Sequence, residues 1–169
     1  VQVAPAGRAA WTEYFGLSPE QAAPGVLASA LRELGFDYVF DTNFSADLTI
    51  MEEGSEFIER FTHRDVYSWP MFTSCCPGWV RFVKGQFPQF AKNLSTAKSP
   101  QQMFGATMKT WYAKKLNMDP SKMVVVGVMP CTAKKFETKR DGEAASGYPD
   151  VDISITTREL ARMIESAGI

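Results

Sequence analysis

Apolar positions recur along the chain in two patterns, and their alternation predicts a mixture of strands and helices. Short β-branched or aromatic runs predict strands over residues 1–4, 38–40, 70–74, 123–129 and 151–156. Apolar residues at intervals of three and four predict helices over residues 26–34, 47–61, 79–90, 100–116 and 157–167. Residues 5–15 are predicted as a loop that enters a helix, and residues 141–150 as a polar loop. Strands that alternate with helices indicate an α/β fold of parallel βαβ units, with helices packed on the sheet.

The ends of several elements are marked by residues that favour helix or strand termini. Gly35 stands where a glycine closes a helix, Ser99 is an N-cap candidate before Pro100, and a threonine caps the last helix. The run 123–129 is continuous and β-branched, as in a buried parallel strand, and Pro130 ends it. We expect one α/β unit over residues 1–169, and an incomplete one, because no closing element follows the last helix.

The composition narrows the class of protein. The chain has 169 residues, a formal net charge of −1, 45% hydrophobic and 22% charged residues. These values favour a folded domain, and the near-neutral charge argues against a nucleic-acid or membrane-surface binder, since both need a basic excess. No run approaches the ~20 apolar residues of a membrane span. The first residues do not resemble a signal peptide. Three cysteines are too few for a disulfide scaffold.

The cysteines carry the strongest chemical signal. Cys75 and Cys76 are adjacent in the segment FTSCCPGW, and Cys131 lies in MPCTAKKFE. Both segments follow a predicted strand, and ligands of open parallel sheets bind at the carboxyl ends of strands. Adjacent cysteines rarely bond to each other, but one turn can direct their two sulfurs to different sites.

Several readings of these cysteines are open from the residues alone. They are small buried hydrophobes, zinc ligands, nucleophiles or iron–sulfur ligands. Zinc is disfavoured because CxxC and CxxH spacings are absent, and a Cys–His nucleophile is disfavoured because the only histidine, His63, lies in a polar loop. Iron–sulfur ligation fits better, although a cuboidal cluster needs four thiolates and this chain has three cysteines.

At these positions the chain resembles the catalytic domain of the iron-iron (FeFe, iron-only) hydrogenases. Residues 73–79 match the family signature TSCCPGW, and residues 129–137 match MPCxxKxxE. The resemblance continues through VQVAPA, FDTNFSADLTIMEEGSE, LSTAKSPQQMFG and ITTRELARM, and so covers nearly the whole chain. The third signature, ExMxCxxGCxxGG, is absent. The resemblance therefore implies a partial iron-only hydrogenase catalytic-domain fold, the N-terminal half of an H-cluster domain, without accessory ferredoxin-like domains.

The resemblance also implies a cofactor and its ligands. The H-cluster is a 4Fe-4S cubane bridged to a di-iron subcluster with CO and CN ligands. Cys76 and Cys131 match two cubane ligands, and the absent signature carries the other two. Cys75 matches the thiol that delivers or removes a proton beside the open coordination position of the distal iron. Lys134 matches the donor of a hydrogen bond to a cyanide ligand.

Two further groups of residues match the family's site. The residues that match the lining of the di-iron pocket are Pro5, Ala6, Gln101 and Met129. Those that match the proton relay between Cys75 and solvent are Glu53, Ser95, Glu56 and Arg60.

The physical chemistry of these residues agrees with the roles that the resemblance implies. Cleavage of hydrogen releases protons, so a base must stand within hydrogen-bond reach, and a thiol with an ordinary pKa of about 8.5 is suitable. Glu53, Glu56 and Arg60 are spaced i, i+3 and i+7 along one side of a predicted helix, a pattern that a solvated acidic face also produces. Lys134 follows Cys131 by three residues, which aims it back at the site, although lysine pairs are usually solvated.

The leading functional hypothesis is reversible oxidation of hydrogen to protons and electrons, with ferredoxin or a cytochrome as electron partner. The alternatives are a hydrogen-sensing relative, an iron–sulfur-assembly relative and a non-catalytic fragment. The Cys75–Cys76 pair disfavours the first two, because the sensor tends to alter the proton-transfer cysteine and the assembly relative keeps one cysteine. Without the absent signature, we expect the chain to need a C-terminal segment or a complementary chain. The family occurs in the cytoplasm, which we expect here, and in the periplasm.

Overall fold

A four-stranded parallel sheet organises the protein, as a computed structural model describes it over residues 1–18, 20–21 and 23–169. The strands are β1 (Gln2–Val3), β2 (Phe40–Asp41), β3 (Val126–Met129) and β4 (Ile153–Thr156), in the spatial order β2-β1-β3-β4. Gln2 pairs with Phe40 on one side and with Gly127 on the other, and all three strand pairs are parallel. The predicted α/β class with a parallel sheet is confirmed.

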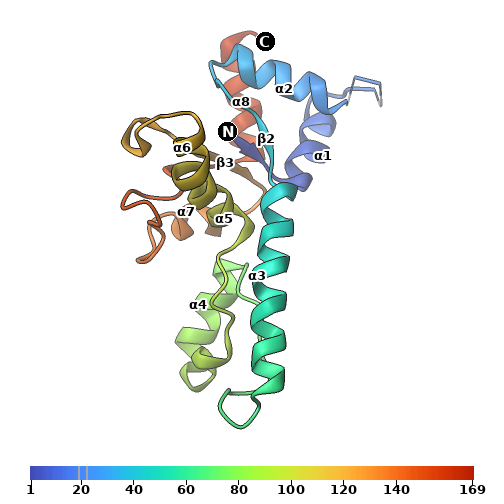
Figure 1. Ribbon diagram of the computed structural model, residues 1–169. Coiled ribbons are helices and arrows are strands. Elements are labelled where there is room, and N and C mark those ends of the chain that lie inside the picture. The colour runs from blue at the N-terminus through green and yellow to red at the C-terminus, as the bar shows by residue number, and fades with distance from the viewer. Residues whose placement is uncertain (19, 22) are drawn as a thin grey trace.

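Three helices cover one face of the sheet (Figure 1). They are α1 (Pro5–Tyr14), α2 (Pro24–Glu33) and α8 (Thr157–Ala167). The core between them and the strands consists of Val3, Trp11, Leu27, Ala30, Leu31, Val128, Leu160 and Ile164. The α8 helix begins with a capping box, in which the side chains of Thr156 and Glu159 exchange hydrogen bonds with each other's backbone N–H groups. The predicted threonine cap is thus present at Thr156.

A second group of helical segments covers the opposite face. It comprises α5 (Pro100–Thr107), the π-helical turn η2 (Met108–Tyr112) and α6 (Ala113–Lys115), where the sequence predicts one continuous helix. Phe104 and Met108 pack there against Val125 and Val151. Gly105 allows this close approach, because a Cβ atom on it would lie 2.2 Å from the carbonyl oxygen of Asp150.

The long helix α3 (Asn43–Thr62) extends away from the sheet (Figure 1), and α4 (Pro77–Gln86) contacts the short helix α7 (Ala133–Glu137). The 3-10 helix η1 (Pro88–Asn93) follows α4 where a single helix over residues 79–90 is predicted. Pro88 explains the break, since it has no N–H to continue the α-helical hydrogen bonds. Val80, Val83 and Leu94 form a separate small core here. The remaining element is η3 (Pro120–Lys122).

Two of the predicted elements are wrong. Residues 70–74 do not join the sheet, because α3 carries the chain away from it, and Phe72 forms an isolated parallel bridge with Leu94. Residues 5–15 do not begin as a loop, since α1 begins directly at Pro5. The buried positions of α1 are Gly7 and Trp11, and a glycine that packs on the sheet gives no apolar signal in the sequence. No helix in the described part of the chain is long and apolar enough to cross a membrane.

Candidate active site

The Cys75–Cys76 turn precedes α4, and its second cysteine is the N-cap of that helix. Cys76 has an extended backbone, and its Sγ accepts a hydrogen bond from the N–H of Trp79 at 3.4 Å. Pro77 then occupies the first helical turn. Both cysteines are solvent-exposed. The Cys76 sulfur therefore faces the free backbone N–H groups at the start of α4.

The second cysteine turn lies at the carboxyl end of β3, as the sequence predicts. Cys131 follows Met129, the last residue of β3, by two positions and is partly exposed. Lys134 lies in the first turn of the following helix, α7, and its Nζ donates a hydrogen bond of 2.8 Å to the carbonyl oxygen of Cys75. The two cysteine turns therefore adjoin, although the first follows an isolated bridge and not the sheet strand that the sequence predicts.

The residues that match the family's pocket gather at the same edge of the sheet. Pro5 and Ala6 follow β1, and Met129 ends the neighbouring strand β3. Met129 is buried, whereas Pro5 and Ala6 are exposed. Gln101, near the start of α5, is buried, and its side-chain oxygen accepts a hydrogen bond from Ser154 at 2.9 Å.

Three of the four residues assigned to the relay are joined by hydrogen bonds. The Ser95 hydroxyl donates to Glu56 at 2.6 Å, and the Arg60 guanidinium donates to the same carboxylate at 2.6 Å. Arg60 is buried and also donates to the carbonyl oxygen of Leu94 at 3.0 Å. Glu53 lies one turn before Glu56 in α3 and is partly exposed, and among the described residues it has no hydrogen bond to Ser95 or Glu56.

The comparison with protein families decides which fold this site belongs to. The family described as "Iron only hydrogenase large subunit, C-terminal domain" matches residues 1–169. The chain belongs to the iron-only hydrogenase family. It is 55% identical to the NADP-reducing hydrogenase subunit HndD of Solidesulfovibrio fructosivorans over its whole length, which is 30% of that relative. It is also 37% identical to the cytosolic Fe-S cluster assembly factor narfl of Xenopus tropicalis, covering 36% of it.

A solved structure confirms the fold of this hydrogenase-family chain. The structure of HydA(deltaEFG), described as revealing stepwise FeFe-hydrogenase H-cluster assembly, superposes with a TM-score of 0.93 at 47% identity. The match covers 99% of this chain and 42% of that one. The chain thus spans less than half of its hydrogenase relatives' length.

Among the residues assigned to the relay, Glu56 is surrounded by groups that favour its ionised form. Burial raises the pKa of Glu56, but hydrogen bonds from the Ser95 hydroxyl, the Thr96 N–H and the Arg60 guanidinium together hold the pKa below its usual value. A pocket of about 590 Å³, lined by Ser74 and Ser95 among others, opens beside this group. Ser95 is one of the residues assigned to the relay, and Ser74 immediately precedes Cys75 in the chain.

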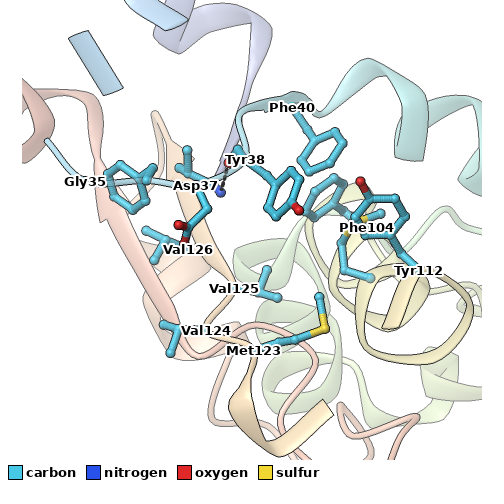
Figure 2. A pocket seen from close by; sticks show the side chains of 13 residues that line it. Gly35, Asp37, Tyr38, Phe40, Phe104, Tyr112, Met123, Val124, Val125 and Val126 are labelled. Carbon is cyan, nitrogen blue, oxygen red and sulfur yellow. Dashed lines mark hydrogen bonds between the residues drawn. The ribbon is translucent and has the colours of Figure 1, made fainter. Parts of the chain in front are cut away.

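Another pocket lies elsewhere, between α5, η2 and the amino ends of the strands (Figure 2). It has a volume of about 220 Å³ and is mainly apolar, with the rings of Tyr38, Phe40, Phe104 and Tyr112 along one side. The residues that the sequence assigns to the site lie at the opposite edge of the sheet or beside α3. The aromatic pocket is therefore separate from the two cysteine turns.

The donor set at the two cysteine turns fits iron–sulfur chemistry. Thiolates are the usual ligands of iron–sulfur clusters, and Cys76 and Cys131 present sulfur at adjoining turns. Within residues 1–18, 20–21 and 23–169, no three His, Cys, Asp or Glu side chains form a metal-binding group. The described residues thus offer thiolates for part of a cluster.

Glu137 lies beside Lys134 and Gln101, and no role is predicted for it from the sequence. Its fully buried carboxylate accepts hydrogen bonds from Lys134 at 3.1 and 3.0 Å, from Ser99 at 2.9 Å and from Gln101 at 3.1 Å. The available signal was its place as the last position of MPCxxKxxE. A glutamate three residues after a lysine in a helix is within ion-pairing reach.

Proposed function

We propose that this chain forms part of a hydrogenase active-site domain that interconverts hydrogen with protons and electrons. The observation that carries the proposal is the 2.8 Å hydrogen bond from Lys134 to the Cys75 carbonyl oxygen. This bond brings Cys75 and Cys76 to the turn that contains Cys131. Two thiols that match cluster ligands and a third that matches a proton carrier thus lie at adjoining turns.

Cys76 and Cys131 would hold two corners of the cubane of an H-cluster. The remaining thiolates would come from a further protein segment, since a cubane takes four. When bound, the H-cluster supplies the metal centre at which hydrogen is split and its two electrons are taken up. Lys134, with three N–H donors, would anchor a cyanide ligand, and Pro5, Ala6, Gln101 and Met129 would enclose the di-iron part.

Cys75 would take the proton that hydrogen cleavage releases, and would return one in the reverse direction. A thiol is suited to this step because its ordinary pKa of about 8.5 lies near neutral pH. The Cys75 side chain is free for this role, because the adjacent Cys76 takes the ligand position. Each hydrogen molecule then yields two protons, which leave through the protein, and two electrons, which leave through a carrier of the ferredoxin or cytochrome class.

The proton path would run from Cys75 through Glu53 to Ser95, then to Glu56 and Arg60. The hydrogen bonds from Ser95 and Arg60 to Glu56 support its outer half. The inner half requires Glu53 to accept a proton from Cys75 and to pass it to Ser95. Glu53 is partly exposed and lies one helical turn from Glu56, so its side chain would have to rotate to enter the path.

The resemblance to the assembly factor narfl supports a second candidate function, iron–sulfur cluster assembly. The two functions place different demands on Cys75, because cluster binding leaves it unused and proton transfer requires it. We favour hydrogen turnover because Cys75 is present. We further propose a cytoplasmic location, with the periplasm as the alternative, and a single structural unit over residues 1–169.

The test replaces Cys75 with alanine in the full-length, cluster-loaded protein. Cys75→Ala is expected to lower hydrogen turnover at least about 100-fold, the contribution of a positioned proton donor, while the infrared CO and CN bands of the cluster remain. Ser55→Ala, on the exposed side of α3, is the control and should retain full turnover. Loss of the CO and CN bands in Cys75→Ala would make Cys75 a ligand and contradict the assignment. Turnover that survives the substitution would remove Cys75 from proton transfer.

A further inference from the structure

One buried carboxylate holds the lysine that bridges the two cysteine turns. Lys134 Nζ donates to the Cys75 carbonyl oxygen at 2.8 Å and to both carboxylate oxygens of Glu137 at 3.1 and 3.0 Å. The Glu137 side chain is fully buried, and 14% of the Lys134 side chain is exposed. Cys75 and Lys134 are 59 positions apart in the chain. Lys134, held by Glu137 within α7, therefore joins two segments that are distant in the chain.

We propose that Glu137 is a positioning residue. Its charge holds the Lys134 side chain between the two cysteine turns, so that the turns are fixed relative to each other before a cluster binds. The inference rests on the proposed function, which assigns Cys76 and Cys131 as cluster ligands. Lys134 follows Cys131 by three residues, and the carbonyl that it binds immediately precedes Cys76. Its hydrogen bond thus spans the gap between the two ligands.

The surroundings of Glu137 require a carboxylate. Ser99 donates its hydroxyl proton and Gln101 an amide proton to the same oxygen, Oε2, and Lys134 donates to both oxygens. The Gln101 amide is oriented by its own partners, since its oxygen accepts from Ser154 and its nitrogen also faces the carbonyl oxygen of Lys134 at 3.3 Å. A glutamine at position 137 would turn its NH₂ group toward one of these donors, and an acceptor would be lost.

The charge of Glu137 also decides where Lys134 points. A partly buried ammonium group needs an opposite charge, because its own desolvation is unfavourable. Without the carboxylate, the Cys75 carbonyl is the remaining acceptor of the ammonium among its present partners. The lysine side chain is long and partly exposed, so we expect it to turn to solvent. The Cys75 carbonyl would then lose its donor, and the turns would lose their link.

The adjacent cysteines allow this link to be measured directly. In the full 169-residue chain, free of iron and sulfide, labelling cysteine with carbonyl ¹³C and with ¹⁵N creates one directly bonded ¹³C–¹⁵N pair, at Cys75–Cys76. A triple-resonance NMR spectrum that selects such pairs contains a single signal, from the carbonyl that accepts the Lys134 hydrogen bond. The variants Glu137→Gln, Lys134→Met and their combination are compared, with Glu159→Gln as control. Glu159 pairs with the neighbouring Lys135, so this control removes a similar charge.

If Glu137 acts through Lys134, Glu137→Gln and Lys134→Met shift the Cys75 carbonyl resonance in the same direction, and the double variant shifts it no further than Lys134→Met. The control leaves the resonance unchanged. A Cys75 signal that moves in Lys134→Met but not in Glu137→Gln would overturn the proposal, and so would shifts that add in the double variant.

A variant that does not fold is recognised by a signal at the random-coil position. If this occurs for Glu137→Gln, Glu137→Asp replaces it, because aspartate keeps the charge but shortens the reach to Lys134. A partial shift of the Cys75 signal then supports the proposal, and an unchanged signal overturns it.

Uptake of sulfide with equal amounts of ferrous and ferric iron separates this proposal from the function on which it rests. In the full-length protein, Glu137→Gln and Lys134→Met are expected to slow formation of the 4Fe-4S absorption by the same factor. Equal rates in Glu137→Gln and the unmodified protein would overturn pre-positioning. Failure of the unmodified protein to take up iron and sulfide would count against the proposed function, and the carbonyl resonance still decides the role of Glu137.

Discussion

The hydroxyl group of Ser95 lies 2.6 Å from the carboxylate of Glu56, although 39 positions separate them in the chain. The isolated bridge makes this contact possible, because the N–H of Ser95 donates to the carbonyl oxygen of Phe72 at 2.7 Å. The bridge thus places the segment after η1, which contains Ser95, next to α3. It also places this segment next to the extended segment that contains Phe72 and precedes Cys75. One short pairing outside the sheet connects the cysteine turn to the relay that we propose.

Glu53 is the link of this relay that the hydrogen bonds leave open. Glu53→Gln is expected to slow hydrogen oxidation and proton reduction on the order of 10²-fold, because an amide cannot take up and release a proton at neutral pH. Initial rates in both directions measure the effect, with hydrogen uptake coupled to a dye and evolution followed by gas chromatography. Glu52→Gln is the control, since Glu52 is the exposed neighbour in the same helix. Unchanged rates in Glu53→Gln would remove it from the path.

Arg60 is the residue on which the outer part of the relay depends structurally. Its side chain is 6% exposed, and its guanidinium forms an ion pair with Glu56 and donates a hydrogen bond to the carbonyl oxygen of Leu94. Arg60→Met is expected to lower the free energy of unfolding by about 3 kcal/mol, because it leaves the Glu56 carboxylate without its ion-pair partner. Arg64→Met, which removes a guanidinium stacked over Phe61, should cost about 1 kcal/mol or less. Urea unfolding measures both, and equal losses would contradict this account.

Periodicity was enough to predict the sheet and most of its helices. The runs before Pro130 and Thr157 have the β-branched composition of parallel strands, and both form strands of the sheet, although only the first is buried throughout. Residues 70–74 also have the pattern of a short strand. A segment joins a sheet only if the chain before it places it beside a strand, and the long α3 places residues 70–74 away from the sheet. The local sequence of residues 70–74 does not show how far from the sheet α3 places them.

The candidate site was predicted where motifs name single residues, and missed where a group of partners defines the role. The signatures point to Cys76, Cys131 and Lys134, whose roles stay predictions, and the position of Lys134 in the first helical turn is confirmed. Glu137 stands in the same signature, but its role depends on Ser99 and Gln101, which lie more than thirty positions earlier. A buried carboxylate surrounded by donors is a tertiary feature, and it is read from the structure alone.

Gly127 provides the space for the group that surrounds Glu137. A Cβ atom at this position would lie 2.7 Å from the side-chain oxygen of Gln101, which is buried. Gly127→Ala is expected to cost about 1–3 kcal/mol of unfolding free energy, because Gln101 must move inside a packed site. Gly54→Ala is the matched control in the interior of α3, where a Cβ meets open space, and it should stabilise by about 0.5–1 kcal/mol. Thermal unfolding compares the two, and a neutral Gly127→Ala would show that Gln101 is free to move.

Lys98 forms ion pairs with two buried carboxylates at the edge of the pocket beside Ser95. Its Nζ lies 2.7 Å from Glu143 and 2.8 Å from Asp150, whose side chains are 5% and 0% exposed. Lys98→Met is expected to lower the free energy of unfolding by about 3 kcal/mol at pH 7, since both carboxylates lose a partner. Lys84→Met, on the exposed side of α4 at the same pocket, is the control and should remain within about 0.5 kcal/mol of the unmodified protein.

The same lysine makes a prediction about alkaline pH. Burial lowers the pKa of Lys98, but its hydrogen bonds to Asp150 and Glu143 and their negative charges outweigh burial and hold the pKa above its ordinary value of 10.5. A group whose pKa is higher in the folded state stabilises that state fully below its unfolded pKa, and the contribution is lost as the pH rises through the folded pKa. The difference in unfolding free energy between the unmodified protein and Lys98→Met is therefore expected to be constant from pH 7 to about pH 10 and to shrink above 10.5. Urea unfolding of the two proteins across this range measures the difference directly. A difference that already falls between pH 7 and 9 would mean that Lys98 loses its proton early and that the two carboxylates do not hold its charge.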